Sequence, residues 1–548
     1  MSNWQSKSGE ILKEKRTHLI FSLLVLAGAF GIVLYYIWGK VFITEYQSDC
    51  TDTLLWAQAT LESGSLFKNT FDYAYRLAFG GQWLFMPFLK LFGVGMTALR
   101  AGMSLFVTLY TIVLIFFFRS LDHRWYEALF ESAVMLFAMC ATKKTREIFY
   151  GHIIHYSLAI FYLLTAFIFL RLAVNAKSRG KFIIYAILLT VILFMCSVNG
   201  TVQMLFVTLP MLAGCIIEFY LHKDKKLLTT ICAIILAAVL GFLFSKSLNT
   251  NYSDSYSVIV PSGNWGDNLA NFPLRWISLF YQLPGRNLDA FTSLWLKTVF
   301  KTIIALSMLF GLILSFSRHT QIKNREGRLF LYTTWAMFAA FLFFFTFGKI
   351  SDVDWRITPL VVGCEITVLI LFRQLLSEKT ERTVSTGLTL LCGLMLIVHS
   401  LSNGLSVLRI SYDKKIWFAE NGLLETLKAH DLDYGYITSY WLSNSITVLS
   451  DNTIRPRVVS IDENKTIYLN PFNSDLEWYN TQPGRDRYFL VLRAEEYAPE
   501  MPEAKQASEI YSCIQEDTRN MRTDEYIILV HDHNIMQEEY EKLLPRYQ

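Results

Sequence analysis

The sequence predicts a polytopic α-helical membrane protein that ends in a small α/β domain. Hydrophobic residues make up 53% of the chain and charged residues only 18%, and the mean hydropathy is +0.33. Apolar runs of about 18 or more residues recur up to position 406, and each is long enough to cross a bilayer. From position 412 the composition becomes mixed and charged, which is typical of a folded domain outside the membrane.

The apolar runs predict about eleven transmembrane helices. They lie at 18–39, 99–118, 126–142, 156–173, 182–198, 203–220, 228–246, 296–316, 329–347, 358–375 and 386–406. The first run is too long for a cleaved signal peptide, so we interpret it as a retained anchor.

The basic residues predict the orientation. Residues 1–17 form a basic amphipathic lead with Lys7, Lys13, Lys15 and Arg16, which the positive-inside rule places at the cytoplasmic surface. Alternate short loops then carry clusters of lysine and arginine, as this orientation requires. An odd number of spans places 407–548 outside the cytoplasm, so we expect a multi-pass protein of the plasma membrane.

Charge and cysteine content exclude other classes. A formal net charge of +4 is too weak to indicate nucleic-acid binding. The eight cysteines include no CxxC pair, so neither a zinc site nor a disulfide framework is indicated.

Within the first outer loop, at 40–98, the stretch from Glu45 to Phe67 contains four carboxylates: Glu45, Asp49, Asp52 and Glu62. Asp49 and Asp52 are three residues apart and would share one face of a helix. We expect a short helix at 53–61 and an interfacial helix at 82–92, which is too short to span. The acids are either solvated loop residues or a catalytic base beside a lipid-embedded substrate.

The second outer loop, at 142–155, is basic on the side where the positive-inside rule disfavours cations. It contains Lys143, Lys144, Arg146, His152 and His155. Such an excess of positive charge suggests a bound anion, for which phosphate is suitable. The alternative is that these side chains only snorkel to the interface.

Three further outer segments complete this side. Residues 197–200 predict a tight turn. The long loop at 247–295, with an interfacial helix at 272–283, is either a lid or a packed cap. Near 348–359, Asp352 and Asp354 form a weak DxD match, and Arg356 could bind a phosphate bidentately or pair with one of these acids.

The C-terminal region, at 412–548, predicts one helix at 419–430 and strands at 434–440, 457–461, 488–492 and 526–531. It contains no GxGxxG, P-loop, GxSxG or HExxH motif, so no chemistry is indicated there.

The first hundred residues resemble the GT-C class of integral-membrane glycosyltransferases, which includes protein O-mannosyltransferases and the lipid A aminoarabinose transferase. The resemblance lies in SDCTDTLLWA at 48–57, ESGSLF at 62–67, WLFMPFLKLFG at 83–93 and Arg100, and later in Arg356 with Pro359. Two departures concern the substrate: the adjacent Asp-Glu pair of the mannosyltransferases is absent, and Ile357 stands where tyrosine is usual.

The resemblance implies an enzyme that takes a sugar from a polyprenyl-phosphate carrier and transfers it to an envelope acceptor on the outer face. Asp49 would be the general base, with Asp52 as its partner. Cations would stabilise the carrier phosphate as it leaves; the candidate donor-binding residues are Arg356, Lys143, Lys144, Arg146, His152 and His155.

Three alternatives stay open. A divalent cation could bridge the acids and His152 or His155. A transporter or flippase of lipid-linked saccharide would need ionisable groups at mid-span, for which Glu365 is the main candidate. A non-enzymatic envelope assembly protein would use the outer domain as a binding module.

Overall fold

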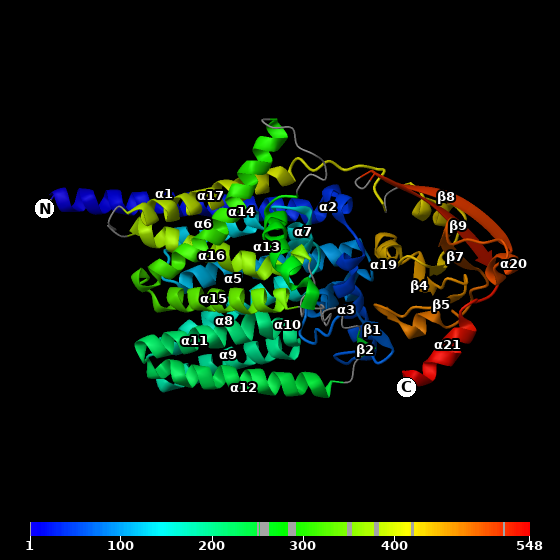
Figure 1. Cartoon of the computed structure of the whole chain (residues 1–548), viewed down its shortest axis with the longest axis horizontal. Coiled ribbons are helices and arrows are strands. Elements are labelled where there is room, and N and C mark those ends of the chain that lie inside the picture. Colours follow the sequence, from blue (N-terminus) through cyan, green and yellow to red (C-terminus); the bar gives the residue numbers. More distant parts are fainter. Residues whose placement is uncertain are drawn as a thin grey trace.

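The computed structural model describes residues 2–248, 251–252, 262–282, 292–347, 353–377, 383–417, 421–518 and 521–547. A bundle of long helices lies along the longest axis of the molecule, and the α/β domain packs against one end of it (Figure 1). The N-terminus lies at the opposite end of the bundle. This arrangement confirms the predicted fold class.

In the described part of the chain, ten helical segments are long and apolar enough to cross a membrane. They are formed by α1 (Ser2–Trp38), α5 (Met96–Ser120), α8 (His155–Val174), α9 (Arg179–Val198), the continuous run α10 (Thr201–Gln203), η3 (Met204–Thr208) and α11 (Leu209–His222), then α12 (Lys225–Ser247), α14 (Ser293–Arg318), α15 (Arg325–Thr346), α16 (Thr358–Ser377) and α17 (Val384–Val407). Ten of the expected runs are therefore confirmed. The basic lead does not form a separate segment, because α1 begins at Ser2.

The expected run at 126–142 differs from the prediction. Its helix, α6 (Trp125–Ala138), has 14 residues, which gives about 21 Å at 1.5 Å per residue and is too short for a helical span. It is buried against α1, α5 and α17. The chain then continues through α7 (Lys143–Arg146) and η2 (Glu147–Gly151), so it still reaches the end of the bundle where His152 contacts Asp49.

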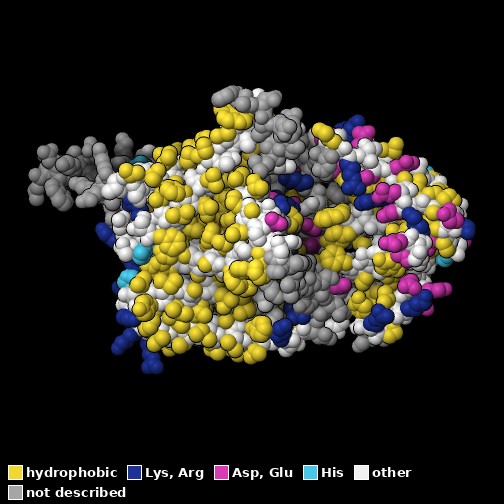
Figure 2. Space-filling model, in the orientation of Figure 1, with side chains coloured by type: hydrophobic (Ala, Val, Ile, Leu, Met, Phe, Trp, Pro, Cys, Tyr) yellow, Lys and Arg dark blue, Asp and Glu magenta, His cyan; other side chains and the backbone are white. Residues whose placement is uncertain are grey.

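The outside of the bundle is apolar. Large hydrophobic side chains such as Leu236, Leu240 and Leu243 on α12 are exposed, and Figure 2 shows hydrophobic side chains covering the bundle while charged side chains spread over the α/β domain. An exposed apolar surface of this extent is expected where lipid covers the protein.

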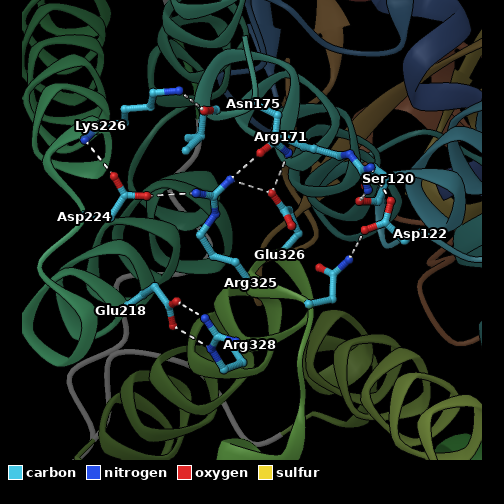
Figure 3. A network of polar contacts seen from close by, with 12 residues as sticks. Ser120, Asp122, Arg171, Asn175, Glu218, Asp224, Lys226, Arg325, Glu326 and Arg328 are labelled. Atoms are coloured by element: carbon cyan, nitrogen blue, oxygen red, sulfur yellow. Dashed lines mark hydrogen bonds and ion pairs between the residues drawn. The ribbon is translucent and has the colours of Figure 1, made fainter. Parts of the chain in front are cut away.

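Paired charges close the end of the bundle away from the α/β domain (Figure 3). Arg328 binds both carboxylate oxygens of Glu218, at 2.5 and 3.2 Å. Arg325 donates to Asp224 at 2.8 Å and to Glu326 at 2.9 Å. These contacts connect α11 and α12 to α15.

The α/β domain contains a six-stranded sheet in the order β5-β4-β3-β7-β9-β8. Its strands are β3 (Tyr434–Ile437), β4 (Arg455–Ile461), β5 (Ile467–Leu469), β7 (Tyr488–Arg493), β8 (Glu509–Asp517) and β9 (Arg522–His531), and its helices are α18 (Leu423–Ala429), α19 (Tyr440–Leu449), α20 (Pro502–Gln506) and α21 (Gln537–Leu543). The four predicted strands are confirmed. β5 and β8, at the two edges of the sheet, were not predicted, because half-exposed edge strands carry a weak apolar signal.

The first outer loop connects the two parts. It contains α2 (Lys40–Glu45), η1 (Ser48–Thr51), α3 (Asp52–Ser63), β1 (Phe71–Tyr73) and α4 (Gln82–Phe92), so the helices predicted at 53–61 and 82–92 are confirmed. β1 pairs with β6 (Ser474–Asp475) of the α/β domain and with β2 (Asn251–Tyr252). The helix expected at 272–283 is α13 (Trp265–Phe280), which begins earlier, and position 283 lies outside the described residues.

Candidate active site

The acids of the first outer loop lie where the bundle meets the α/β domain. Asp49 is in the single turn η1, and Asp52 begins α3 directly after it. The turn packs closely on the second outer loop, because a Cβ atom added at Gly151 would come within 3.2 Å of Cys50 Sγ. The first and second outer loops predicted to form the site are therefore in contact.

Asp49 is half-buried, and its carboxylate has no hydrogen bond or ion pair with any residue that the structure describes. Burial and, less strongly, the nearby charge of Glu147 raise the pKa of Asp49 to about 6, against the opposing effect of Lys144. A carboxylate with a pKa near neutral is a stronger base than an ordinary aspartate and is still ionised at pH 7.

Asp52 has a different environment. It is buried and accepts hydrogen bonds from Asn473 Nδ2 at 2.5 Å and from Tyr440 Oη at 3.2 Å, both in the α/β domain. Asn473 in turn accepts from Trp56 Nε1 at 2.7 Å. Burial and the charge of Asp49 raise the pKa of Asp52. The fixed hydrogen bonds make Asp52 a connection between the loop and the domain.

His152 closes the other side of the Asp49 turn. Its Nδ1 lies 3.2 Å from the carbonyl oxygen of Asp49, an acceptor, so Nδ1 carries the proton and Nε2 is left as an acceptor. Nε2 is buried and has no partner in the described part of the chain. Burial lowers the pKa of His152, so the ring is neutral at pH 7.

Lys144 is the predicted cation that faces Asp49. Its Nζ lies 2.8 and 2.9 Å from the two carboxylate oxygens of Glu147 and 4.6 Å from the centre of the Trp355 ring. Burial lowers the pKa of Lys144, but the charges of Glu147 and, less strongly, of Asp49 and Asp354 raise it. The pKa of Lys144 therefore lies above its ordinary value. The late outer segment therefore reaches the second outer loop through the contact between Trp355 and Lys144.

Arg146 and Glu45 form a buried ion pair instead of facing a ligand. Arg146 Nε donates to Glu45 at 2.8 Å and Nη2 donates to its other oxygen, while Nη1 donates to the carbonyl of Cys140 at 2.8 Å. Tyr36 Oη also donates to Glu45, at 2.8 Å. With all three nitrogens engaged, Arg146 fixes the second loop to the end of α2.

The remaining predicted residues lie around this core. Arg356 is buried in η6 (Asp354–Ile357) and interacts electrostatically with His155. His155 is buried with its ring 4.6 Å from that of Tyr75. His152 and His155 are both buried, so neither side chain extends to the membrane surface. Lys143 is half-buried on α7. Asp352 lies outside the described residues.

The geometry gives no support to a metal site. No group of three His, Cys, Asp or Glu side chains that could hold a metal ion occurs in the part of the chain that the structure describes. Glu147, the acid beside Asp49 and His152, is engaged by Lys144.

Four residues that shape the site were not singled out from the sequence: Glu147, Trp355, Tyr440 and Asn473. Glu147 stands within the basic stretch and its acidic charge was a usable signal. Tyr440 and Asn473 come 388 and 421 residues after Asp52, and only the folded chain brings them together.

Comparisons with known proteins add two distant likenesses. No family model and no curated protein sequence matches this chain. The crystal structure of ArnT from Cupriavidus metallidurans in the apo state is similar over 88% of this chain and 93% of that one, with 10% identity and a TM-score of 0.49. The Archaeoglobus fulgidus oligosaccharyltransferase, solved in complex with zinc and sulfate, is similar over 85% and 67%, with 13% identity and a TM-score of 0.40. Both are GT-C membrane glycosyltransferases.

Proposed function

We propose that this protein is a GT-C membrane glycosyltransferase that moves a sugar from a polyprenyl-phosphate carrier to an envelope acceptor, with Asp49 as the general base. The observation behind the proposal is the state of Asp49: a half-buried carboxylate with a pKa of about 6 and no polar partner among the described residues. Every other predicted acid of the loop is engaged: Glu45 by Arg146, Asp52 by Asn473 and Glu62 by Lys68.

The reaction needs a base because an acceptor hydroxyl is a poor nucleophile at neutral pH. Asp49 takes the hydroxyl proton as the acceptor oxygen forms a bond to the anomeric carbon of the sugar. The bond from that carbon to the carrier phosphate oxygen breaks, and the phosphate leaves with the electron pair. Asp52, which burial favours in its neutral form, does not compete for the acceptor proton.

Cations next to Asp49 can stabilise the leaving phosphate. Lys144 is the best placed, since it lies beside Asp49 and Trp355, and Arg356 follows Trp355 directly. A bound phosphate group would replace Glu147 as the partner of the Lys144 ammonium group. Arg146 is not assigned to the phosphate, because Glu45 and the Cys140 carbonyl occupy its nitrogens.

The charge distribution supports an outer location for the site. Figure 2 shows lysine and arginine side chains gathered at the end of the bundle far from the α/β domain. The positive-inside rule assigns such an end to the cytoplasm. The Asp49 end and the α/β domain would then face outward, where lipid-linked donors without a nucleotide are used.

The test is Asp49→Asn in reconstituted liposomes, with polyprenyl-phosphate carrying a radiolabelled hexose or pentose and an envelope fraction as acceptor. Loss of the base should lower the transfer rate by about 10²–10⁴-fold. Glu62→Gln is the matched control, because Glu62 is an exposed acid of the same loop whose partners are Lys68 and Gln58; its rate should stay within about twofold of wild type.

Wild-type transfer by folded Asp49→Asn protein would contradict the assignment of the base. If wild-type protein moved the labelled carrier across the bilayer without transferring its sugar, the flippase alternative would replace the proposal.

A further inference from the structure

Three arginines meet where the strands β3 and β4 of the α/β domain begin, away from the Asp49 site. Arg455 and Arg457 are two residues apart on β4, so they project from the same face of the strand. On the neighbouring strand β3 they pair with Tyr434 and Tyr436. Arg485 comes from the loop before β7, and its guanidinium lies 5.0 Å from the centre of the Tyr434 ring.

Arg457 is the centre of this cluster. Its guanidinium carbon lies 4.0 Å from the centre of the Trp478 ring and 5.5 Å from that of Tyr434, and the residue is only 5% exposed. Nε and Nη1 are buried and have no hydrogen-bond acceptor in the described part of the chain. A guanidinium has five donors, and leaving them buried without acceptors is costly. The rings of Trp478 and Tyr434 face the guanidinium group, and they do not accept hydrogen bonds from the N–H groups that point outward in the guanidinium plane.

The neighbouring charges neutralise only part of the cluster. Asp433 pairs with Arg485, and among the residues that the structure describes the Arg455 side chain donates only to the carbonyl of Asn452, at 2.9 Å. Burial lowers the pKa of Arg455 first, and the positive charges of Arg457 and Arg485 lower it further. Asp433 therefore offsets one of the three positive charges, and Arg455 and Arg457 have no carboxylate partner in the described part of the chain.

A surface hollow of about 340 Å³ opens at the end of the sheet where β3 and β4 begin. Asp433 and Ile454, which line it, directly precede Tyr434 and Arg455 in the sequence, and Lys428 also lines it. The hollow therefore adjoins the chain segments that lead into β3 and β4.

We propose that Arg455, Arg457 and Arg485 bind an oxyanion, a phosphate or carboxylate group, on the outer domain. Guanidinium groups bind such groups bidentately through paired N–H donors. The site is separate from Asp49 and does not depend on the proposed glycosyl transfer. One segment touches both places, since Asn473 donates to Asp52 and Trp478 lies under Arg457.

The proposal is tested by isothermal titration of the full chain in detergent with inorganic phosphate and, in a second arm, with glucuronate. Ionic strength is kept constant with chloride. Arg457→Gln removes the charge and should weaken binding by about 10–100-fold. The matched control is Arg522→Gln, because Arg522 also stacks on a tryptophan, Trp417, at 4.5 Å but has its own carboxylate, Asp524, at 2.7 Å. The control should bind like wild type.

Arg455→Gln provides a second variant if Arg457→Gln does not fold, because Arg455 is only half-buried; it should also weaken binding. Saturable binding of either oxyanion that the arginine variants lose would support the site and show which oxyanion it prefers. Binding of neither ligand, or equal binding by wild type and the folded variants, would overturn it.

Discussion

The two ends of the helical bundle differ in how their carboxylates are paired. At the end away from the α/β domain, Glu218, Asp224 and Glu326 are each bound by an arginine of α15 (Figure 3). At the other end, Glu45, Asp52 and Glu147 have partners, but Asp49 between them has none among the described residues. Paired charges fix helices to one another, whereas a desolvated carboxylate without a partner is available for proton transfer.

The largest effect on stability is expected from Arg146→Met at the Asp49 end. It leaves Glu45 buried without its cation, which should lower the free energy of unfolding by about 3–5 kcal/mol. Thermal unfolding in detergent measures this loss. A variant as stable as wild type would show that the ion pair does not fix the second loop.

At the far end, Arg328→Met should cost about 2–4 kcal/mol, because Glu218 is fully buried beside it. The transfer rate per folded molecule should not change, since no residue of this end belongs to the proposed site. A fall in that rate without unfolding would break the distinction between the two ends.

The fold was largely predictable from the sequence, because apolar runs of bilayer length and period-two strands are local signals. The run at 126–142 gave a wrong helix length: its apolar residues extend past Ala138, where the helix stops and the chain turns into the site. In the site, Asp49, Lys144 and His152 were predicted and meet. Arg146 was expected to bind phosphate, and only packing shows that Glu45, 101 residues earlier, occupies it.

The connection to the α/β domain should have a moderate effect. Asn473→Asp replaces the amide that donates to Asp52 with a carboxylate that cannot donate, while the left-handed backbone at φ +52° still suits the residue. We expect a loss of about 1–3 kcal/mol in stability and a lower transfer rate. Asn480→Asp, at an exposed position of the same domain, is the control. If the two variants had the same stability and transfer rate, the contact between the α/β domain and Asp52 would have no role in the site.

Asp49→Asn should gain stability while it loses activity. The pKa of Asp49 is about 6 in the folded protein against an ordinary 3.8, so the carboxylate costs stability once the pH rises through about 6. At pH 8 the variant should be more stable by about 1–3 kcal/mol, and this gain should shrink as the pH falls below 6. A less stable variant at pH 8 would mean that Asp49 has a structural role.

The smallest change, a shift in pH dependence, tests the central claim most directly. The kcat/KM of the wild-type enzyme should fall below a pH of about 6, as Asp49 takes up a proton. Glu147→Gln removes the neighbouring charge that raises the pKa of Asp49, so the midpoint of this fall should move to lower pH. A midpoint that stays in place in folded Glu147→Gln protein, or a wild-type profile without this acidic fall, would contradict Asp49 as the general base.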